Sequence, residues 1–558
     1  MLEEFINNIC ACNGRLLPAS VKKHYQYTSI KIDVSDFYSQ RAIDWAEIRI
    51  PSDFFTTGKA SIYVDKKYCL KIPHVEPDGK VCVGDGDLGA FSGEEPINRV
   101  GWLITNFEND FIIPWNEGQL DYDFIEEPIS YWNIYVHKKQ SSRSAVKHVY
   151  LDAYAPEELS VIEGKLLNKS KTIIASSAGN KRLSKLINSI NPNDTLINVD
   201  VIIVNIEQPY NPSIWPRTDA DVLREIRYNA GIEFTNKFIQ SRKQYKSKKH
   251  HLVIFKHIDN QYGYLMSNGP RKVEKLETIY GRTITRNIIQ DSPVPLQVKR
   301  IDQNWIVGRD TIPAVNHRSG LTILIVGCGA LGSFIINHLA QSGIGYLTIV
   351  DHDIFEAENM SRHSLGLNSI KKSKAIELKR ELERKSPHCI VDTFTGNFIG
   401  YANKYDINEF DLIVDVSGED SVAIEIEAYR TNIPFVKAWM EPYVSAAHVC
   451  YFPPNKQYQR GFIGQLKCAD WPREVMTKLP GCSSYFQSYS VTAAAFCVAM
   501  TSELIMEMLD EPANKSIVRT WLREKSYFSK FNSDVKLSDW TKNHALKYGQ
   551  VIDRDINV

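Results

Sequence analysis

The N-terminal part of the chain changes its hydrophobic pattern from a period of two to a helical period. Residues 45–51 and 59–64 alternate apolar and polar side chains, which is typical of half-buried strands. A turn sequence, Pro-Asp-Gly at 77–79, then delivers Cys82 onto an extended segment. Residues 94–111 follow with helical spacing. The pattern predicts a sheet followed by a helix, with Cys82 between them.

The middle of the chain, residues 121–309, is predicted to be mixed α and β. Apolar runs at 196–204 and 251–255 predict strands, and the nearly continuous first run indicates a sheet covered on both faces. Residues 220–240 predict a helix with an interior glycine, Gly231. Because this region contains no catalytic motif that we recognise, we assign it to a linker and a docking or dimer-forming domain.

The clearest pattern in the chain predicts a strand, a glycine-rich turn, a helix and a second strand. An apolar run at 321–326 ends in the turn GCGALG at 327–332, and a second apolar run at 346–350 stops at Asp351. Glycines in such a turn let the backbone approach a phosphate at a helix N-terminus. An acidic residue after the second strand is placed to hold a ribose hydroxyl. We therefore predict a nucleotide site.

Five polar side chains follow this unit and extend the predicted site. They are Asp353, Asn359, Arg362, Lys374 and Asp415. Lys374 lies in a helix predicted over 371–385, and Asp415 ends a further apolar strand. Because doubly wound sheets bind ligands at the carboxyl ends of their strands, Gly329, Asp351 and Asp415 are expected to gather at one edge.

The charges of the predicted site favour ATP over a nicotinamide cofactor. Lysine and arginine compensate phosphate oxygens while charge builds in nucleotidyl transfer, and an aspartate suits magnesium held through oxygen ligands. A nicotinamide cofactor would account for the glycines and Asp351, but not for Arg362, Lys374 and Asp415. We therefore predict ATP and Mg²⁺ as cofactors, with Asp415 as the metal ligand.

Composition indicates which kinds of partner and which cellular compartment to expect. The 66 basic and 66 acidic residues cancel, so the global charge predicts neither nucleic acid nor an anionic membrane as partner. Ten cysteines without any CxxC pair fit reduced thiols and give no support to a structural zinc site. The first ten residues lack a signal-peptide pattern, and polar residues interrupt the apolar stretch at 491–509, which predicts a buried helix. We expect a cytoplasmic protein.

The nucleotide-site residues occur in an order that resembles the ubiquitin-activating-enzyme family, which includes the bacterial ThiF and MoeB adenylyltransferases. The matching positions are Gly327, Gly329, Gly332, Ser333, Asp351, Asp353, Asn359, Arg362, Lys374 and Asp415. The resemblance implies a Rossmann-like, doubly wound adenylation domain over residues 310–558. It further implies that Asp351 holds the ribose, Arg362 and Lys374 the phosphates, and Asp415 the magnesium, while a protein's C-terminal carboxylate is adenylated.

Two further features of that family bear on this sequence. Thioester-forming members place their cysteine in a loop before the helix that corresponds to 491–509, which implies Cys482. A nearby helix N-terminus would favour its thiolate. Cys468, in a more polar loop, is the alternative. Family members also use an arginine of the partner subunit, for which Arg309 is a candidate.

The strand, turn, Gly-x-x-Cys and helix order near the N-terminus resembles the ubiquitin-conjugating-enzyme fold. In that family a cysteine three residues after a turn glycine carries the thioester, which implies this role for Cys82 after Gly79. The resemblance implies an α+β conjugating-like domain over residues 1–120. The family's His-Pro-Asn element, whose asparagine supports the oxyanion, is absent, and His74-Val-Glu stands before the cysteine. A structural cysteine in an unrelated β-rich domain is the alternative.

The two ends together resemble the fused conjugating–activating proteins of bacterial CBASS antiphage operons, so we expect an α/β and α+β multidomain fold. This family implies a homodimer that activates the C-terminus of a cGAS-like nucleotidyltransferase, passes it from Cys482 to Cys82 and joins it to acceptor amines. Three alternatives remain open. They are a sulfur-carrier adenylyltransferase with a non-catalytic N-terminal binding domain, a non-catalytic scaffold, and a nicotinamide-dependent oxidoreductase.

Overall fold

The fold is taken from a computed structural model of the chain. It describes residues 2–37, 41–56, 58–83, 95–140, 146–153, 159–244, 250–266, 271–279, 282–290, 293–472, 477–478, 485–486, 489, 491–531, 535–545 and 550–554. The chain forms two compact units. The first comprises Met1–Leu151, Ala155–Ser177 and Asp194–Lys299, and the second comprises Asp152–Tyr154, Ala178–Asn193 and Arg300–Val558.

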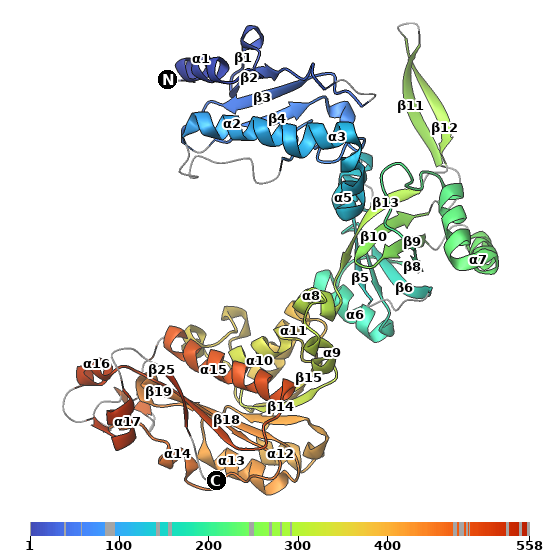
Figure 1. Ribbon diagram of the computed structural model, residues 1–558. Coiled ribbons are helices and arrows are strands. Elements are labelled where there is room, and N and C mark those ends of the chain that lie inside the picture. The colour runs from blue at the N-terminus through green and yellow to red at the C-terminus, as the bar shows by residue number, and fades with distance from the viewer. Residues whose placement is uncertain are drawn as a thin grey trace. The chain divides into compact units, whose positions relative to one another are not determined.

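The first unit begins with helix α1 (Leu2–Cys12) and a four-stranded antiparallel sheet in the order β1-β2-β3-β4 (Figure 1). Its strands are β1 (Lys22–Lys23), β2 (Tyr27–Ile32), β3 (Ala46–Pro51) and β4 (Ser61–Val64). Buried and partly exposed residues alternate strictly along β3, as the period-two pattern predicts. Ile48 and Ile50 pack in one core with Phe5 of α1 and Leu103 of the helix that follows the sheet.

Several helical segments follow this sheet. They are α2 (Pro96–Asn106), a π-helical turn (Phe107–Ile112), α3 (Ile113–Glu117), α4 (Asp123–Glu126) and α5 (Pro128–Lys139). Proline begins α2 and α5, where its missing N–H costs no helical hydrogen bond. The helix predicted over 94–111 is therefore found, with a π-helical C-terminal turn.

The middle region contains a closed barrel with the strand order β10-β13-β5-β7-β6-β8-β9. Its strands are β5 (His148–Asp152), β6 (Ser160–Leu167), β7 (Thr172–Ser176), β8 (Leu196–Asn205), β9 (His250–His257), β10 (Asn260–Leu265) and β13 (Val294–Arg300). A separate hairpin is formed by β11 (Arg271–Ile279) and β12 (Arg282–Gln290) (Figure 1).

Strand β8 is buried on both faces, which explains its nearly continuous apolar sequence. Helices α5 and α7 (Asp219–Gln244) share a core cluster with alternate residues of the barrel strands, including Ile202 and Val204. Val201 and Ile203, which point to the opposite face, are also completely buried. Helix α7 is broken at Gly231, whose φ of 83° is outside the helical region. The prediction of a strand buried on both faces is therefore confirmed.

The second unit contains an eight-stranded sheet in the order β16-β15-β14-β17-β18-β19-β23-β25 (Figure 1). Its strands are β14 (Thr322–Val326), β15 (Tyr346–Val350), β16 (Ile390–Phe394), β17 (Leu412–Asp415), β18 (Phe435–Met440), β19 (Ala446–Phe452), β23 (Ile517–Leu522) and β25 (Gln550–Arg554). The first five strands in spatial order are parallel, and the rest pair antiparallel.

Helices cover both faces of this sheet, as a doubly wound fold requires. One face packs against α10 (Gly332–Gln341), α11 (Lys374–Lys385) and α15 (Val491–Asp510), and the other against α12 (Phe398–Ala402), α13 (Asp420–Tyr429) and α14 (Phe462–Gln465). Helix α15 is long and apolar enough to cross a membrane, and half of it is buried inside the unit. It contacts α10 and strands β18, β19 and β23, as the predicted buried helix should.

The smaller elements of the second unit complete its description. They are α6 (Gly179–Ile190), α8 (Gln303–Gly308), α9 (Ala314–Arg318), α16 (Lys525–Phe528), α17 (Asp539–His544), β20 (Ala469–Asp470), β21 (Thr477–Lys478), β22 (Tyr485–Phe486) and β24 (Lys536–Leu537). Helix α6 packs against α11, and the hydroxyl of Ser189 donates to the carbonyl of Glu383 over 2.6 Å.

The described fold confirms part of the predicted fold class and leaves the domain boundaries as a prediction. Mixed α and β content and a doubly wound C-terminal sheet are found, whereas the proposed boundaries at 120 and 309 stay a prediction. Helix α11 begins at Lys374, three residues later than predicted, because Ser373 is its N-cap and the Ser373 hydroxyl accepts from the Ile376 N–H.

Gly345, before β15, provides a test of this packing. An alanine Cβ there would lie 1.8 Å from the carbonyl oxygen of Ser319, so the backbone would have to move. We expect Gly345→Ala to lower the free energy of unfolding by roughly 2–4 kcal/mol. Thermal unfolding and hydrogen exchange of β15 measure the effect. Gly320→Ala is the control, because its Cβ meets His317 at an ordinary 3.6 Å. Equal midpoints for the two variants would contradict the expectation.

Candidate functional site

A cavity of about 660 Å³ lies at the carboxyl ends of β14, β15, β17 and β18. Seven of the nine residues predicted to bind the nucleotide line it: Gly327, Gly329, Asp351, Asp353, Asn359, Arg362 and Lys374. Residues that the sequence did not single out also line it, among them His363, Asn397, Ser417, Glu419, Glu441 and Tyr489. The doubly wound topology therefore gathers side chains spread over more than 160 positions of the chain.

The three glycines of the turn are required for different reasons. Gly327 has a φ of 93°, and a Cβ there would approach the backbone nitrogen of Ser417 to 2.8 Å. A Cβ on Gly332 would come within 2.1 Å of the Gly327 carbonyl oxygen, so this glycine lets α10 pack against the turn. Gly329 meets nothing within 4 Å and lines the cavity. A phosphate can therefore approach the backbone at Gly329.

The Asp351 carboxylate is held at the cavity edge by two backbone groups. Its Oδ2 accepts from the Cys328 N–H over 2.7 Å, and its Oδ1 accepts from the Asp353 N–H over 2.7 Å. Each carboxylate oxygen can accept a second hydrogen bond, so the group can still bind a ribose hydroxyl. The Cys328 thiol is buried, and burial raises its pKa well above the usual value, which agrees with a packing role.

Lys374 and Asp353 form an ion pair on the cavity wall. The ammonium nitrogen lies 2.7 Å from Asp353 Oδ2, and the lysine side chain is 8% exposed while the aspartate is half exposed. Because Lys374 begins α11 and its N–H donates to the Asp353 carbonyl, the backbone fixes this pair. The Lys374 side chain is thus largely removed from water, and it lines the cavity.

Asn359 and Arg362 lie in the 3₁₀ helix Ala357–Arg362, which a capping box with Glu356 stabilises. The Asn359 side-chain oxygen accepts from the Glu356 N–H over 3.0 Å, so its placement is fixed. The Arg362 guanidinium lies 5.9 Å from the ring centre of Tyr489, a distance that suits a cation–π contact. Tyr489 was missed in the sequence, where it is one aromatic residue among many.

His363 is a second residue that the sequence analysis missed. It is buried, its Nε2 bonds to the Cys328 carbonyl oxygen over 2.7 Å, and its Nδ1 accepts from the Leu365 N–H over 3.1 Å. Burial lowers the pKa of His363 from 6.5 to about 4. The neutral imidazole therefore ties the glycine turn to the loop that carries Arg362. No spacing in the sequence signals this role.

Asp415, expected at the edge of the nucleotide site, lies in different surroundings. It is completely buried and does not line the cavity, and its Oδ2 lies 2.6 Å from Nζ of Lys437, which is also completely buried. Its Oδ1 accepts from the N–H and the hydroxyl of Ser417. Magnesium ligation by Asp415 stays a prediction. Oxygen donors that suit Mg²⁺ also line the cavity on Asp353, Glu419 and Glu425, so the residues present fit the ion.

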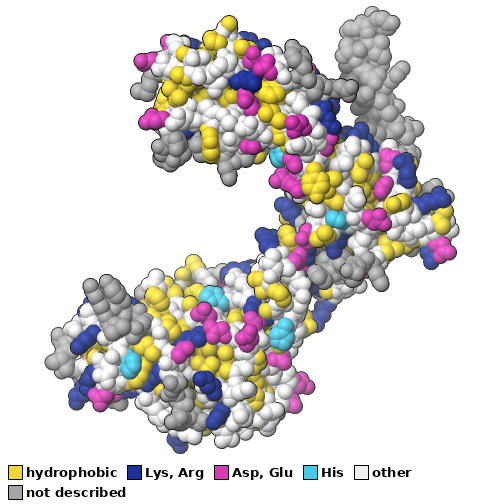
Figure 2. Space-filling view, in the orientation of Figure 1, with side chains coloured by type: hydrophobic (Ala, Val, Ile, Leu, Met, Phe, Trp, Pro, Cys, Tyr) yellow, Lys and Arg dark blue, Asp and Glu magenta, His cyan; other side chains and the backbone are white. Residues whose placement is uncertain are grey.

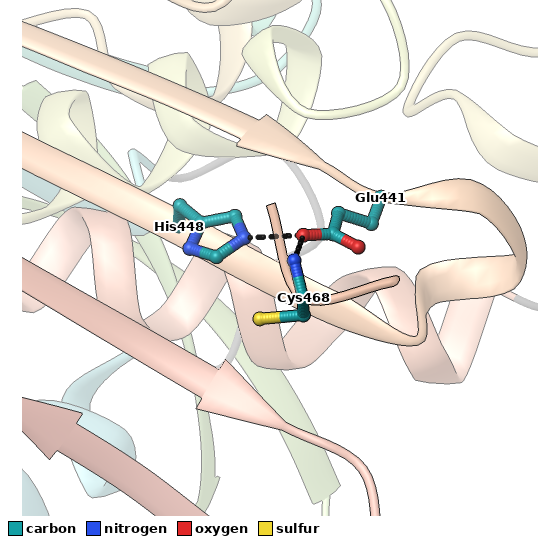
Figure 3. A group of neighbouring side chains, drawn as sticks. All are labelled: Glu441, His448 and Cys468. Atoms are coloured by element: carbon teal, nitrogen blue, oxygen red, sulfur yellow. Dashed lines mark hydrogen bonds and ion pairs between the residues drawn. The ribbon is translucent and has the colours of Figure 1, made fainter. Parts of the chain in front are cut away.

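Glu441, which lines the cavity, forms a buried cluster with His448 and Cys468 (Figure 3). Their potential ligand atoms lie within 4.8 Å of one another, so the set could in principle hold a metal. Glu441 already accepts from the Cys468 N–H over 2.5 Å, from the Ala469 N–H and from His448 Nε2 over 3.1 Å. These bonds satisfy the carboxylate, and we interpret the cluster as an anchor for the loop before β20.

The cysteines predicted to carry thioesters are placed differently. Cys82 is exposed, three residues after Gly79, whose φ is 93°. Cys482 lies outside the described residues. Its alternative, Cys468, is buried, and burial followed by the charge of Glu441 raises the pKa of its thiol to about 12. A protonated, buried thiol is a poor nucleophile, so the geometry disfavours Cys468.

Two other predictions concern charge. Arg309, the candidate arginine for a partner subunit, ends α8 and lies 5.1 Å from the ring centre of Trp305 in its own chain. On the face drawn in Figure 2, lysine and arginine side chains are interspersed with aspartate and glutamate. This mixing agrees with the balanced composition.

The family match lies within the second unit. Residues 315–537 match the ThiF family. The ATP-dependent ubiquitin transferase-like protein Cap2 of Pseudomonas aeruginosa is 23% identical over 234 residues, 39% of this chain and 41% of that protein. The adenylyltransferase and sulfurtransferase UBA4 of Eremothecium gossypii is 38% identical over 95 residues, 17% of this chain and 21% of that protein. These matches therefore span less than half of each relative.

Among solved structures, a crystal structure of E. coli MccB with ATP matches 37% of this chain and 62% of that chain. The sequence identity is 19% and the TM-score is 0.30.

His363 predicts how stability changes with pH. Its pKa is 6.5 in the unfolded chain and about 4 when folded, so the unfolded chain takes up the proton first as the pH falls. Stability is full above pH 6.5 and is lost as the pH falls towards 4, by roughly 3 kcal/mol. In urea unfolding, His363→Gln should remove most of this acid loss. The exposed His317→Gln is the control, and an unchanged profile in His363→Gln would contradict the assignment.

Proposed function

We propose that this chain, whose residues 315–537 are a ThiF-family domain, uses ATP to adenylate the C-terminal carboxylate of a partner protein. The observation that carries this proposal is the cavity at the carboxyl ends of four strands. It combines a glycine turn open to a phosphate, a ribose-binding carboxylate and two cations, Arg362 and Lys374. A redox cofactor would leave those cations without a role.

Each residue has a task in the proposed reaction. Asp351 accepts hydrogen bonds from the ribose, and the backbone at Gly329 receives the phosphates. When the partner's carboxylate attacks the α-phosphorus, the P–O bond to pyrophosphate breaks, and Lys374 and Arg362 stabilise the charge that builds on the phosphate oxygens. Magnesium, which Asp415 is proposed to hold, would neutralise further phosphate charge. Asn359 fixes the loop that carries Arg362.

After adenylation, two cysteines are proposed to carry the activated carboxylate. Cys482 attacks the acyl adenylate to form a thioester and releases AMP, and the acyl group then moves to Cys82 by thioester exchange. An amine of an acceptor protein finally attacks the thioester at Cys82. The exposure of Cys82 on a conjugating-like domain, residues 1–120, supports this order. The stretch 121–309 would serve as the docking or dimer-forming domain.

The expected partner is a cGAS-like nucleotidyltransferase of a bacterial antiviral operon, and the expected assembly is a cytoplasmic homodimer. The similarity to proteins named ATP-dependent ubiquitin transferase-like protein Cap2 supports this choice of setting. The identity to UBA4, named an adenylyltransferase and sulfurtransferase, favours a second candidate. In that case the second unit would adenylate a sulfur carrier, and residues 1–120 would only bind a partner.

The adenylation step is tested at Lys374. We expect Lys374→Met to lower ATP–pyrophosphate exchange by about 100-fold, because one preorganised cation is lost at the reacting phosphate. The assay contains the full chain, ATP, Mg²⁺ and the cGAS-like synthase encoded in the same operon. Lys372→Met is the matched control, since this exposed lysine lies two positions away and does not line the cavity. Equal exchange rates in both variants would refute the proposed phosphate contact.

The relay is tested on non-reducing gels with the same components. Wild type should form adducts that dithiothreitol removes, Cys82→Ala should keep the adduct on Cys482, and Cys482→Ala should form neither. Cys12→Ala is the control, because Cys12 is also an exposed thiol of the first unit. If Cys82→Ala leaves product formation intact, the sulfur-carrier candidate is favoured. If no variant shows a reducible adduct while exchange continues, the relay is wrong and adenylation stands.

A further inference from the structure

The exposed Cys82 lies directly opposite His74. Val75 and Val81 form an antiparallel bridge, and the next pair outward is His74 and Cys82. The Cys82 N–H donates to the His74 carbonyl oxygen over 2.8 Å. Neighbouring strands in such a pair place opposite residues about 5 Å apart at their Cα atoms. The backbone therefore places His74 next to the residue whose thiol is proposed to carry the acyl group.

His74 is held in an unusual backbone conformation. Its φ is 62°, in the left-handed region, which is uncommon for residues other than glycine, although asparagine, aspartate and histidine adopt it more often than most. Its N–H donates to the hydroxyl of Tyr131 over 3.2 Å, and its carbonyl receives the Cys82 N–H. Burial raises the pKa of Tyr131 to about 12, so this hydroxyl stays neutral. A strained residue fixed from two sides next to a reactive group points to a functional role.

The side chain of His74 is oriented by a carboxylate. Its Nε2 lies 2.7 Å from Asp123 Oδ2, and each side chain is about a quarter exposed. Because an ionised carboxylate only accepts, this bond requires a proton on Nε2, which in the neutral imidazole leaves the lone pair on Nδ1. Within the described residues, the structure records no hydrogen-bond partner for Nδ1. The titratable groups that act on the Tyr131 hydroxyl, which accepts from the His74 N–H, are Asp123 of α4, Glu127 at the start of α5 and Cys82.

We propose that His74, oriented by Asp123, accepts the proton of the amine that attacks the thioester at Cys82. This inference rests on the proposed function and assigns a residue to its last step. The amine nitrogen bonds to the thioester carbon, its proton moves to Nδ1 of His74, and the C–S bond breaks with the Cys82 thiolate as leaving group. The imidazolium can then return the proton to the thiolate, so the step needs no other reactant.

The test loads Cys82 without ATP or the natural partner. The full chain is incubated with the thioester of acetyl-glycyl-glycine and 2-mercaptoethanesulfonate, which transfers its acyl group to accessible thiols. Peptide mass spectrometry separates the adduct on Cys82 from that on the exposed Cys12. Methoxyamine, whose nitrogen is already neutral, then discharges the adduct between about pH 5 and 8, where histidine changes charge.

Wild type and His74→Asn should load Cys82 to the same extent, since asparagine tolerates the left-handed backbone. Discharge should slow by about 100-fold in His74→Asn at the upper pH. The wild-type rate should fall with acid, since an imidazolium cannot accept the proton of the amine, and this dependence should vanish in the variant. Asp123→Asn should weaken the same pH dependence, and His24→Asn, an exposed histidine of the same unit, should behave like wild type.

Discharge of His74→Asn within about twofold of wild type, or with the same acid limb, would overturn the assignment. That result would leave the proposed relay untouched, because loading by ATP is measured separately. Conversely, if ATP and the partner never load Cys82 but discharge depends on His74, the proposed function fails and the role of His74 stands.

Discussion

The carboxylate of Asp351 connects the loops that follow two neighbouring parallel strands, and most of the nucleotide site depends on it. One oxygen receives the Cys328 N–H of the glycine turn, and the other receives the Asp353 N–H of the next loop. The Cys328 carbonyl in turn bonds to His363, and Asp353 pairs with Lys374. Charge-assisted bonds of this kind are stronger than neutral ones. The positions of both cations, Arg362 and Lys374, therefore depend on the Asp351 side chain.

A different principle applies beneath the cavity, where Asp415 and Lys437 are completely buried as a pair. Such pairs add little net stability, because desolvation offsets much of the attraction, but loss of one partner leaves an unpaired buried charge. Lys437 also donates to the Glu419 carbonyl at the start of α13. The main effect of the pair is therefore to fix how the ends of β17 and β18 pack against α13, and its net contribution to stability is small.

Patterns of the sequence predicted the parts of the fold in which local spacing and tertiary environment agree. The βαβ unit and strand β8 carry nearly continuous apolar runs, and α15 carries an apolar run that a few polar residues interrupt. Gly327 and Gly332 of the turn have steric requirements that only glycine meets. The pairing of Asp415 with Lys437 and the burial of His363 were missed, because both arise from contacts between distant segments. Cys82 was identified by its turn, but Asp123, which bonds to His74, comes from a helix some 40 residues after Cys82.

Helix α6 has a consequence for how the chain reaches its final fold. It belongs to the second unit, although it is encoded between strands β7 and β8 of the barrel, and it packs on α11 about 190 residues later. Domains generally fold from the N-terminus during synthesis, so α6 leaves the ribosome long before the surface that it covers exists. The barrel of the first unit must therefore close while α6, inserted between β7 and β8, has not yet packed against α11. A fragment beginning at residue 300 would lack this helix, and the side of α11 that Ser189 contacts at Glu383 would face water.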